Sequence, residues 1–240
     1  MSEDQDDAVS GIAALNDPRR RALYRFVAAQ DHAVSRDQAA AALGVSRAVA
    51  ADHLDRLAAG GLLDVEFRRL GGRQGPGAGR PSKLYRRAAH DIAVSLPARQ
   101  YDLAADLLAA AVTVAAERKT PVEVAVDQVA RDRGATMGHA ARQRAGHRAG
   151  GVALVRAAAD VLADHGYEPR VRDREIVLAN CPFHRLAADH TDLVCGMNHS
   201  LLCGMAGALP ETTLAARLEP TPGWCCVRLD VDRPLKEEQP

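Results

Sequence analysis

A short turn between two helix-forming segments places the strongest constraint on how this chain folds. The turn is Gly44-Val45-Ser46, and glycine tolerates the backbone conformation that a tight turn needs. Residues 35–43 before it form an amphipathic segment with Asp37-Gln38 in its first turn, and residues 47–59 after it form a second one that Ser46 caps. The pattern predicts a helix-turn-helix. We expect the second helix to bury Val49, Leu54 and Leu57.

A further helix precedes this motif and a strand, loop and strand follow it. Asn16-Asp17-Pro18 supplies a helix start. Residues 62–67 read as a strand, residues 68–82 as a basic glycine-rich loop, and residues 83–86 as a returning strand, which together make a wing. A nucleotide phosphate loop is the competing interpretation. It fails because the GxxxxGK[ST] pattern is absent and because the loop leads into a strand rather than a helix.

Basic residues gather in the same part of the chain, although the formal net charge of the whole is zero. Residues 17–90 hold 14 lysines and arginines against 7 aspartates and glutamates, whereas residues 151–240 hold 9 against 13. Such an asymmetry is expected when one part binds nucleic acid. The candidate DNA contacts are Ser46, Arg47, Ala51, His53, Arg56, Arg68, Arg69, Arg73, Arg80 and Lys83. We expect Asp52 and Asp55 to be ion-paired or solvated rather than to read cytosines.

Three stretches of residues 12–90 carry a family resemblance. LNDPRRRALYRFV, AAALGVSRAVAADHLDRLAAGGLL and GRPSKLYRR resemble the winged-helix domains of ArsR-like and SufR-like bacterial transcription regulators. The resemblance implies that residues 12–90 form a winged helix-turn-helix that binds double-stranded operator DNA. It does not identify the operator, since recognition depends on side chains and DNA shape.

Residues 91–150 read as helical and contain few chemically specialised residues. Residues 99–118 place apolar side chains on one stripe, and Thr120-Pro121-Val122-Glu123 starts another helix. The stripe consists of Tyr101, Ala104, Leu108, Ala111 and Ala115. A stripe of this kind serves either a domain core or a dimer seam. We expect a helical linker that forms a homodimer, because winged helices usually bind paired half-sites.

The last part of the chain, residues 151–233, predicts an α+β domain that contains all five cysteines: Cys181, Cys195, Cys203, Cys225 and Cys226. Several unpaired thiols point to a reducing compartment. Thiols at a strand end, a helix start and a strand start can converge on one site. If residues 224–231 form a strand, only one of Cys225 and Cys226 faces inward, and Cys225 shares its face with the apolar side chains.

NCPFHRLAADHTDLVCGMNHSLLCGMAGAL and ARLEPTPGWCCVRLDV resemble the sensor domain of SufR-type iron–sulfur repressors. The resemblance implies an iron–sulfur cluster, [4Fe-4S] by preference, held by Cys181, Cys195 and Cys225, with Cys226 as the alternative to Cys225. Thiolates are the ligands that such clusters select. The fourth position would take another residue, for which His184 is a candidate, or a small ligand. Cys203 lies about 12 Å further along a continuous helix and is expected to be a core thiol.

Two other uses of the cysteines stay open. Zinc is the rival metal, because Cys181, Cys195 and Cys225 with His184, His190 or His199 make a Cys₃His set. All five thiols also fit a metal-free core, since free cysteine is commonly buried. A thiol enzyme built on Cys195 and a histidine is the remote alternative, because no motif orients such a pair.

The sequence as a whole predicts a mainly α chain with α+β character. In chain order we expect a disordered acidic segment (1–11), a winged helix-turn-helix (12–90), a helical dimerisation linker (91–150), a cysteine-containing sensor domain (151–233) and a flexible tail (234–240). We expect a cytoplasmic homodimeric regulator, a repressor rather than an enzyme, that reports iron or redox state. The chain shows neither a signal peptide nor an apolar run of membrane-spanning length.

Overall fold

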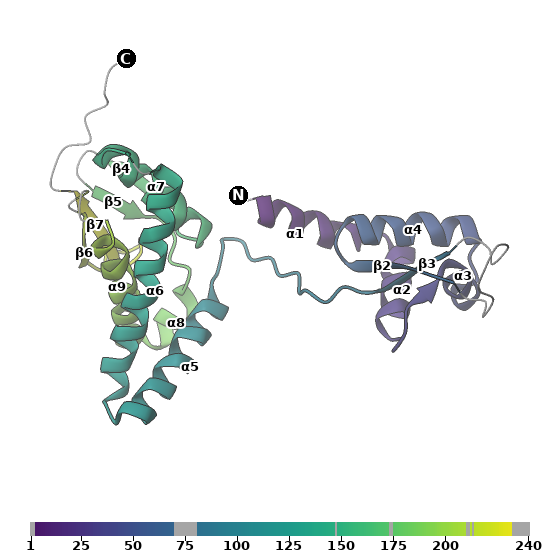
Figure 1. Ribbon diagram of the computed structural model, residues 1–240, viewed down its shortest axis with the longest axis horizontal. Helices are drawn as coiled ribbons and strands as arrows, with labels where there is room; N and C mark the ends of the chain where they lie inside the picture. Colours follow the sequence, from purple (N-terminus) through teal and green to yellow (C-terminus); the bar gives the residue numbers. More distant parts are fainter. Residues whose placement is uncertain are drawn as a thin grey trace, which may run out of the picture. The chain divides into compact units, whose positions relative to one another are not determined.

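The computed structural model describes residues 3–69, 81–146, 148–172, 175–209, 212 and 214–231. It divides into two compact units, unit 1 (residues 1–94) and unit 2 (residues 95–240), which we describe separately (Figure 1). Helices account for 58% of the residues and strands for 15%, so the chain is of the mixed α+β class. Among the described helices, none is both long and apolar enough to cross a membrane.

Unit 1 consists of helices around a small antiparallel sheet. In chain order its elements are α1 (Glu3–Ala14), α2 (Pro18–Ala28), β1 (Val34–Ser35), α3 (Arg36–Leu43), α4 (Arg47–Ala59), β2 (Leu63–Arg68) and β3 (Ser82–Arg87). The strand order is β1-β3-β2, and β2 and β3 pair from Leu63 opposite Arg87 to Arg68 opposite Ser82. The core lies between α2, α3, α4 and the sheet and includes Leu23, Leu54, Leu57 and Tyr85.

Local capping interactions fix the helix boundaries of unit 1. The Asp17 carboxylate accepts from the backbone N–H groups of Arg19 and Arg20 at the start of α2. Ser35 and Gln38 form a reciprocal capping box at the start of α3. Gly44 ends α3 with φ of 63°, a left-handed conformation that favours glycine. The sequence predicted these boundaries because each depends on residues within a few positions.

Asp55 of α4 joins that helix to strand β3. Its carboxylate accepts a hydrogen bond from the Tyr85 hydroxyl at 2.7 Å and forms an ion pair with Lys83. Burial opposes the effect, but the hydrogen bonds from Lys83 and Tyr85 and the Lys83 charge lower the pKa of Asp55 below its usual value. Burial and the Asp55 hydrogen bond raise the pKa of Tyr85. The tie fixes how α4 lies against the strands that flank the loop.

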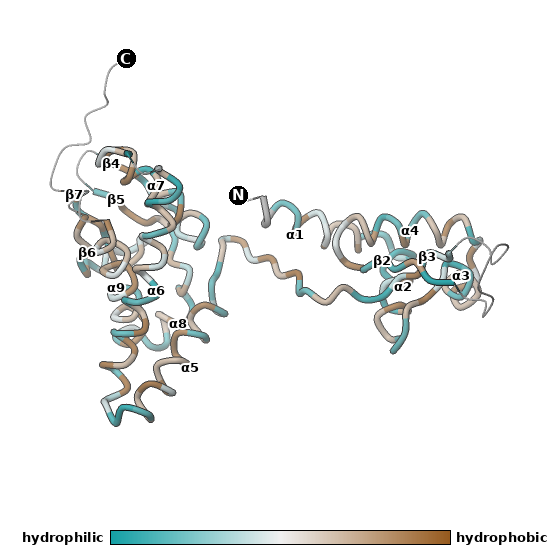
Figure 2. The backbone as a smooth tube through the Cα atoms, in the orientation of Figure 1, coloured by the Kyte–Doolittle hydropathy of each residue, from teal (hydrophilic) through white to brown (hydrophobic). Residues whose placement is uncertain are grey.

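Two expectations for unit 1 are wrong. Residues 3–11 are helical, not disordered, and belong to α1, whose hydrophilic start is visible in Figure 2. The helix packs at Gly11, where an added Cβ would lie 2.7 Å from the Gly60 carbonyl oxygen. In α4 it is Ala50, rather than Val49, that is buried with Leu54 and Leu57. The small side chain lets α4 approach its neighbours closely.

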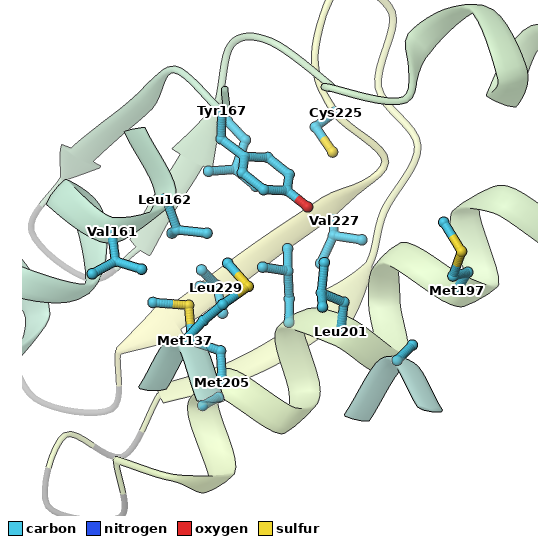
Figure 3. Close-up of a cluster of buried hydrophobic side chains, with 14 of the residues drawn as sticks. Met137, Val161, Leu162, Tyr167, Met197, Leu201, Met205, Cys225, Val227 and Leu229 are labelled. Carbon is cyan, nitrogen blue, oxygen red and sulfur yellow. The ribbon is translucent and has the colours of Figure 1, made fainter. Parts of the chain in front are cut away.

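Unit 2 is built from a helical layer and an antiparallel sheet. Its elements are α5 (Tyr101–Arg118), α6 (Val122–Ala145), α7 (Gly151–Asp164), β4 (Pro169–Arg172), β5 (Glu175–Leu178), α8 (His184–Asp189), α9 (Thr191–Gly207), β6 (Leu214–Leu218) and β7 (Val227–Val231). The strand order is β4-β5-β7-β6. One sheet face is apolar and joins a core with α7 and α9, part of which Figure 3 shows. The other face carries ion pairs, such as Arg228 with Glu175 at 3.4 Å and Arg217 with Asp230 at 3.1 Å.

Helices α6 and α9 lie side by side at unusually close range (Figure 1). Three glycines make this possible. An added Cβ would lie 1.8 Å from the Leu201 carbonyl oxygen at Gly134, 2.5 Å from the Met205 carbonyl oxygen at Gly138, and 2.0 Å from the Arg131 carbonyl oxygen at Gly204. No side chain larger than hydrogen fits at these positions with the present helix spacing.

The region expected to be a separate linker is part of unit 2. Ala104, Ala111 and Ala115 of the predicted α5 stripe are buried in the same core as α9 and the sheet, whereas Tyr101 and Leu108 are only partly covered. The stripe therefore packs within the unit. A pattern of apolar residues cannot distinguish an intramolecular helix contact from a dimer seam. The predicted flexible tail, 234–240, lies outside the described residues.

The α6–α9 crossing yields a prediction about stability. Gly204→Ala should destabilise unit 2 by about 3 kcal/mol, because the new methyl group forces two helix backbones apart. Gly196→Ala, on the same helix but with nothing within 4 Å of its added Cβ, is the matched control. It should stabilise the unit by about 0.5–1 kcal/mol through helix propensity. Scanning calorimetry of both variants measures the difference, and equal transition temperatures would contradict the close crossing.

A second prediction concerns the Asp55 tie and its dependence on pH. Because the pKa of Asp55 is lower in the folded state, its stabilisation is fully present above the usual aspartate pKa of 3.8 and is lost as the pH falls through the folded pKa. Asp55→Asn should cost unit 1 about 1 kcal/mol at pH 7 and progressively less below pH ~4. Urea titration followed by the β3 amide resonances measures this.

Asp52→Asn is the control for that experiment. Asp52 lies on the same helix, but its partner Arg56 is exposed and one turn away, at 3.1 Å. Exposed pairs of this type contribute at most about 0.5 kcal/mol. An equal loss in both variants, or a loss for Asp55→Asn that persists at low pH, would contradict the role given to the tie.

Candidate functional site

The first candidate site is the exposed surface of α4 with the flanking strands. Ser46 caps α4, and its hydroxyl accepts from the Val49 backbone N–H at 3.3 Å. Arg47 follows at the helix start and pairs with Asp37 of α3 at 2.6 Å, with both side chains about two-thirds exposed. Ala51 is partly exposed one turn later. The start of α4 therefore presents a cation at a helix N-terminus, which is also where backbone N–H groups are free to bind phosphate.

The other basic candidates on this surface differ in whether they already form an ion pair with a carboxylate. Arg56 pairs with Asp52 along α4, and Arg68 pairs with Glu66 at 3.6 Å. Arg69 is exposed. The expectation that Asp52 and Asp55 are ion-paired is confirmed. Because exposed pairs are weak, phosphates can replace Asp37 and Asp52 as the partners of Arg47 and Arg56.

Four other candidates do not present a free cation in the described structure. Lys83 is only 28% exposed and is held by Asp55, so its first role is to join β3 to α4 rather than to bind phosphate. His53 is half-buried, and its Nδ1 has no hydrogen-bond partner. Arg73 and Arg80 lie outside the described residues.

The second candidate site is a group of four thiols in unit 2, which we call the thiol group: Cys181, Cys195, Cys225 and Cys226. Cys181 follows β5, Cys195 lies on α9, and Cys225 and Cys226 precede β7. The last three are at most 9% exposed. All five cysteines of the chain are free of disulfides.

Backbone contacts position the two loop segments of the thiol group. The Cys225 N–H donates to the carbonyl of Leu178 at 2.9 Å, which places this cysteine beside the end of β5. The Arg99 guanidinium donates to the carbonyl of Cys181 at 3.0 Å and to the Asn180 side chain at 2.5 Å. Cys195 needs no such tie, because α9 itself carries it into the core.

Cys225 accepts hydrogen bonds from the thiols around it. Hydrogen bonds from the thiols of Cys181 and Cys226 outweigh burial and lower the pKa of Cys225 to about 3, with further help from the Val227 backbone and the Asn198 amide. The same hydrogen bonds, together with burial, raise the pKa of Cys181 and Cys226. Cys195 is linked to this group through Cys226. Cys225 is therefore the acceptor of the group, while the thiols of Cys181 and Cys226 act as donors.

The alternation argument for Cys225 over Cys226 is wrong. It assumed a strand from residue 224, whereas β7 begins at Val227, so both cysteines lie in the preceding loop. A loop does not impose opposite faces on adjacent side chains as a strand does. Both thiols are buried, at 1% and 9% exposure, and both belong to the thiol group.

No histidine takes part in the described contacts of the thiol group. His184 and His190 are exposed. His199 contacts the Cys203 sulfur at 3.5 Å and the Ala216 carbonyl at 3.2 Å, away from the group. The Cys₃His zinc set and the Cys195–histidine pair of a thiol enzyme therefore have no described contact to support them. Cys203 has no described contact with the other thiols. The expectation that it is a core thiol is wrong, because it is partly exposed and does not belong to the core; its described contact is with His199.

The donor set of the thiol group suits a soft metal group. Among the described residues, no three histidine, cysteine, aspartate or glutamate side chains are grouped so as to hold a metal ion as they stand. The hydrogen bonds instead link the sulfurs in series, from Cys181 through Cys225 and Cys226 to Cys195. Four thiols from three segments match the ligands of iron–sulfur clusters and of Cys₄ zinc sites. A metal group would replace their mutual hydrogen bonds.

Two neighbours of the thiol group were missed at the level of sequence. Asn198 lies within the apolar run of α9 and donates its amide to the Cys225 sulfur at 3.2 Å. Trp224 directly precedes Cys225, and the guanidinium groups of Arg170 and Arg172 lie 5.2 and 5.5 Å from its ring centroid. Asn198 could have been identified because it is a polar residue in the middle of an apolar helix face. Such residues are buried only with hydrogen-bonding partners.

Comparison with protein-family models, with curated proteins and with solved structures finds no match to this chain. Its function therefore has to follow from the residues of these two sites.

Proposed function

We propose that the chain is a DNA-binding transcription regulator whose thiol group senses iron or redox state. The observation that carries the proposal is the convergence of four thiols from three segments of unit 2, three of them buried. The other unit presents a capped helix that begins with Arg47 after a tight glycine turn. Thiolates are ligands for a redox-sensitive cluster. The α3–turn–α4 arrangement with its flanking strands supports a winged helix-turn-helix in unit 1.

In this proposal α4 enters the major groove of operator DNA. Arg47 and Arg56 exchange their carboxylate partners for phosphates, and Arg69 adds a further charge. Lys83 contributes mainly by holding β3 against α4. The chain acts as a repressor and a homodimer, so that two α4 helices meet paired half-sites. Exposed apolar side chains on α5 and α6, namely Val112, Val122 and Val124, are the surface we assign to self-association.

In the sensing half of the proposal, Cys181, Cys195, Cys225 and Cys226 hold an iron–sulfur cluster. The cluster supplies an oxidant- and iron-sensitive group, and its loss returns the thiols to their mutual hydrogen bonds. Residues of three segments then change partners together, and this change alters DNA affinity. Five free thiols suit a reducing compartment, which supports a cytoplasmic location. A Cys₄ zinc site is the second candidate, favoured by the lack of histidine contacts.

The first test uses pairs of variants with opposite expected signs. Arg47→Ala should weaken binding to a duplex and lower the slope of log K against log salt by about 0.9, because one phosphate contact is lost. Asp37→Ala should strengthen binding, because it frees Arg47 and removes a negative charge. Fluorescence anisotropy over a salt series measures both. Arg144→Ala, which breaks an ion pair with Asp164 in unit 2, is the neutral control. Equal effects of the Arg47 and Asp37 variants would remove α4 from the interface.

The second test concerns the thiol group. Serine at position 181, 195, 225 or 226 should abolish or sharply destabilise the cluster, because serine keeps the size but not the soft thiolate. Cys203→Ser should retain it. Anaerobic purification followed by visible absorption and iron, sulfide and zinc analysis measures the outcome. Stoichiometric zinc without iron or sulfide would replace the cluster by a Cys₄ zinc site, and no metal at all would refute metal sensing while leaving DNA binding to its own test.

A further inference from the structure

Asn198 is a polar side chain placed where an apolar one would be expected. It is 1% exposed and lies on α9 among Met197, Leu201 and Leu202, all buried. Burying an amide costs several kcal/mol unless its hydrogen-bonding groups find partners. Both ends of the Asn198 amide do so. The Tyr167 hydroxyl donates to Oδ1 at 2.5 Å, and Nδ2 donates to the Cys225 sulfur at 3.2 Å and approaches the Cys226 sulfur at 4.0 Å.

Tyr167 fixes the orientation of this amide. Its ring is 2% exposed and packs edge-to-face on Phe183 with 6.5 Å between centroids. Figure 3 shows the hydroxyl directed toward the region where the Cys225 side chain points. Because the hydroxyl donates to Oδ1, the amide nitrogen is left to face the sulfurs. The Cys225 sulfur also accepts hydrogen bonds from two thiols and one backbone N–H. If the Asn198 amide were turned round, its oxygen would face this sulfur, and two acceptors cannot hydrogen-bond to each other.

We propose that Asn198, locked by Tyr167, is a positioning residue that aims an N–H donor at the Cys225 sulfur and thereby tunes a soft metal group bound by the thiol group. This inference rests on the metal-binding half of the proposed function. Partners that hydrogen-bond to a ligating sulfur orient it and withdraw electron density from it. With the donor in place, the site binds metal more tightly and a cluster accepts an electron at a higher potential.

The test compares three variants of the full chain. Asn198→Leu removes the donor with little change in volume. Tyr167→Phe removes only the hydroxyl that orients the amide and keeps the ring on Phe183. Ser200→Ala is the matched control, because Ser200 lies on the same helix, is 2% exposed and loses a comparable hydrogen bond, to Asp127 at 2.8 Å. It has no described contact with the thiol group.

Two readouts on anaerobic protein separate tuning from packing. The first is titration of the metal-free chain with Co²⁺ alone, followed by its sulfur-to-cobalt absorption. Asn198→Leu should lower the Co²⁺ affinity by about tenfold or more, Tyr167→Phe by less, and Ser200→Ala should not change it. The second is the reduction potential of the reconstituted iron–sulfur protein, which should fall in the same order. Equal behaviour of the Asn198 and Ser200 variants in both readouts would overturn the inference.

A third measurement separates failure of this inference from failure of the proposed function. In the metal-free chain, the Asn198 side-chain amide protons should be protected from solvent exchange and should shift in Cys225→Ser but not in Cys203→Ser. If these resonances do not shift in Cys225→Ser, the positioning role of Asn198 is wrong whatever the site binds. If they respond while the wild type binds neither Co²⁺ nor iron, the hydrogen bond stands, whereas metal sensing and the tuning assigned to Asn198 are both refuted.

Discussion

The close crossing of α6 and α9 is the contact on which the rest of unit 2 depends. Helix α9 carries both Cys195 and Asn198, and its distance from α6 is set by glycines on the two helices, Gly134, Gly138 and Gly204. Backbones that approach this closely leave little freedom to slide, since protein interiors are densely packed. The remaining face of α9 lies against β6 and β7. The positions of Cys195 and Asn198 thus depend on glycines, which have no functional side chain.

Sequence reasoning succeeded where structure is local. Ser35, Gly44 and Ser46 fix helix ends through interactions within a few residues, and the boundaries of α3 and α4 follow from them. It failed where long-range packing decides. The acidic segment 3–11 is helical because α1 packs at Gly11, and α5 joins the core of unit 2 although its stripe reads equally well as a dimer seam. In the thiol group, the resemblance implied Cys181, Cys195 and Cys225 with Cys226 as the alternative, whereas the loop before Val227 lets both Cys225 and Cys226 join the group.

The ion pairs of unit 1 change how its basic charge should be viewed. A count of lysines and arginines treats every cation as available, whereas Arg47 and Arg56 have carboxylate partners at contact distance and Lys83 is half-buried against Asp55. Weak surface ion pairs orient long side chains but still allow them to exchange one anionic partner for another. Such pairs keep the surface of α4 close to neutral until a stronger anion arrives, which limits binding to stray polyanions.

Trp224 is an intrinsic fluorescent probe of the surroundings of the thiol group. It is the chain's single tryptophan, it directly precedes Cys225, and two arginines of β4 stack on its ring. Indole emission depends strongly on nearby charge and on metal centres that accept excitation energy. Emission excited selectively from tryptophan therefore originates beside the thiol group, whereas tyrosines of unit 1, such as Tyr24 and Tyr85, contribute only at shorter wavelengths. Under the proposed function, filling, oxidation or emptying of that site would change this emission on the native protein.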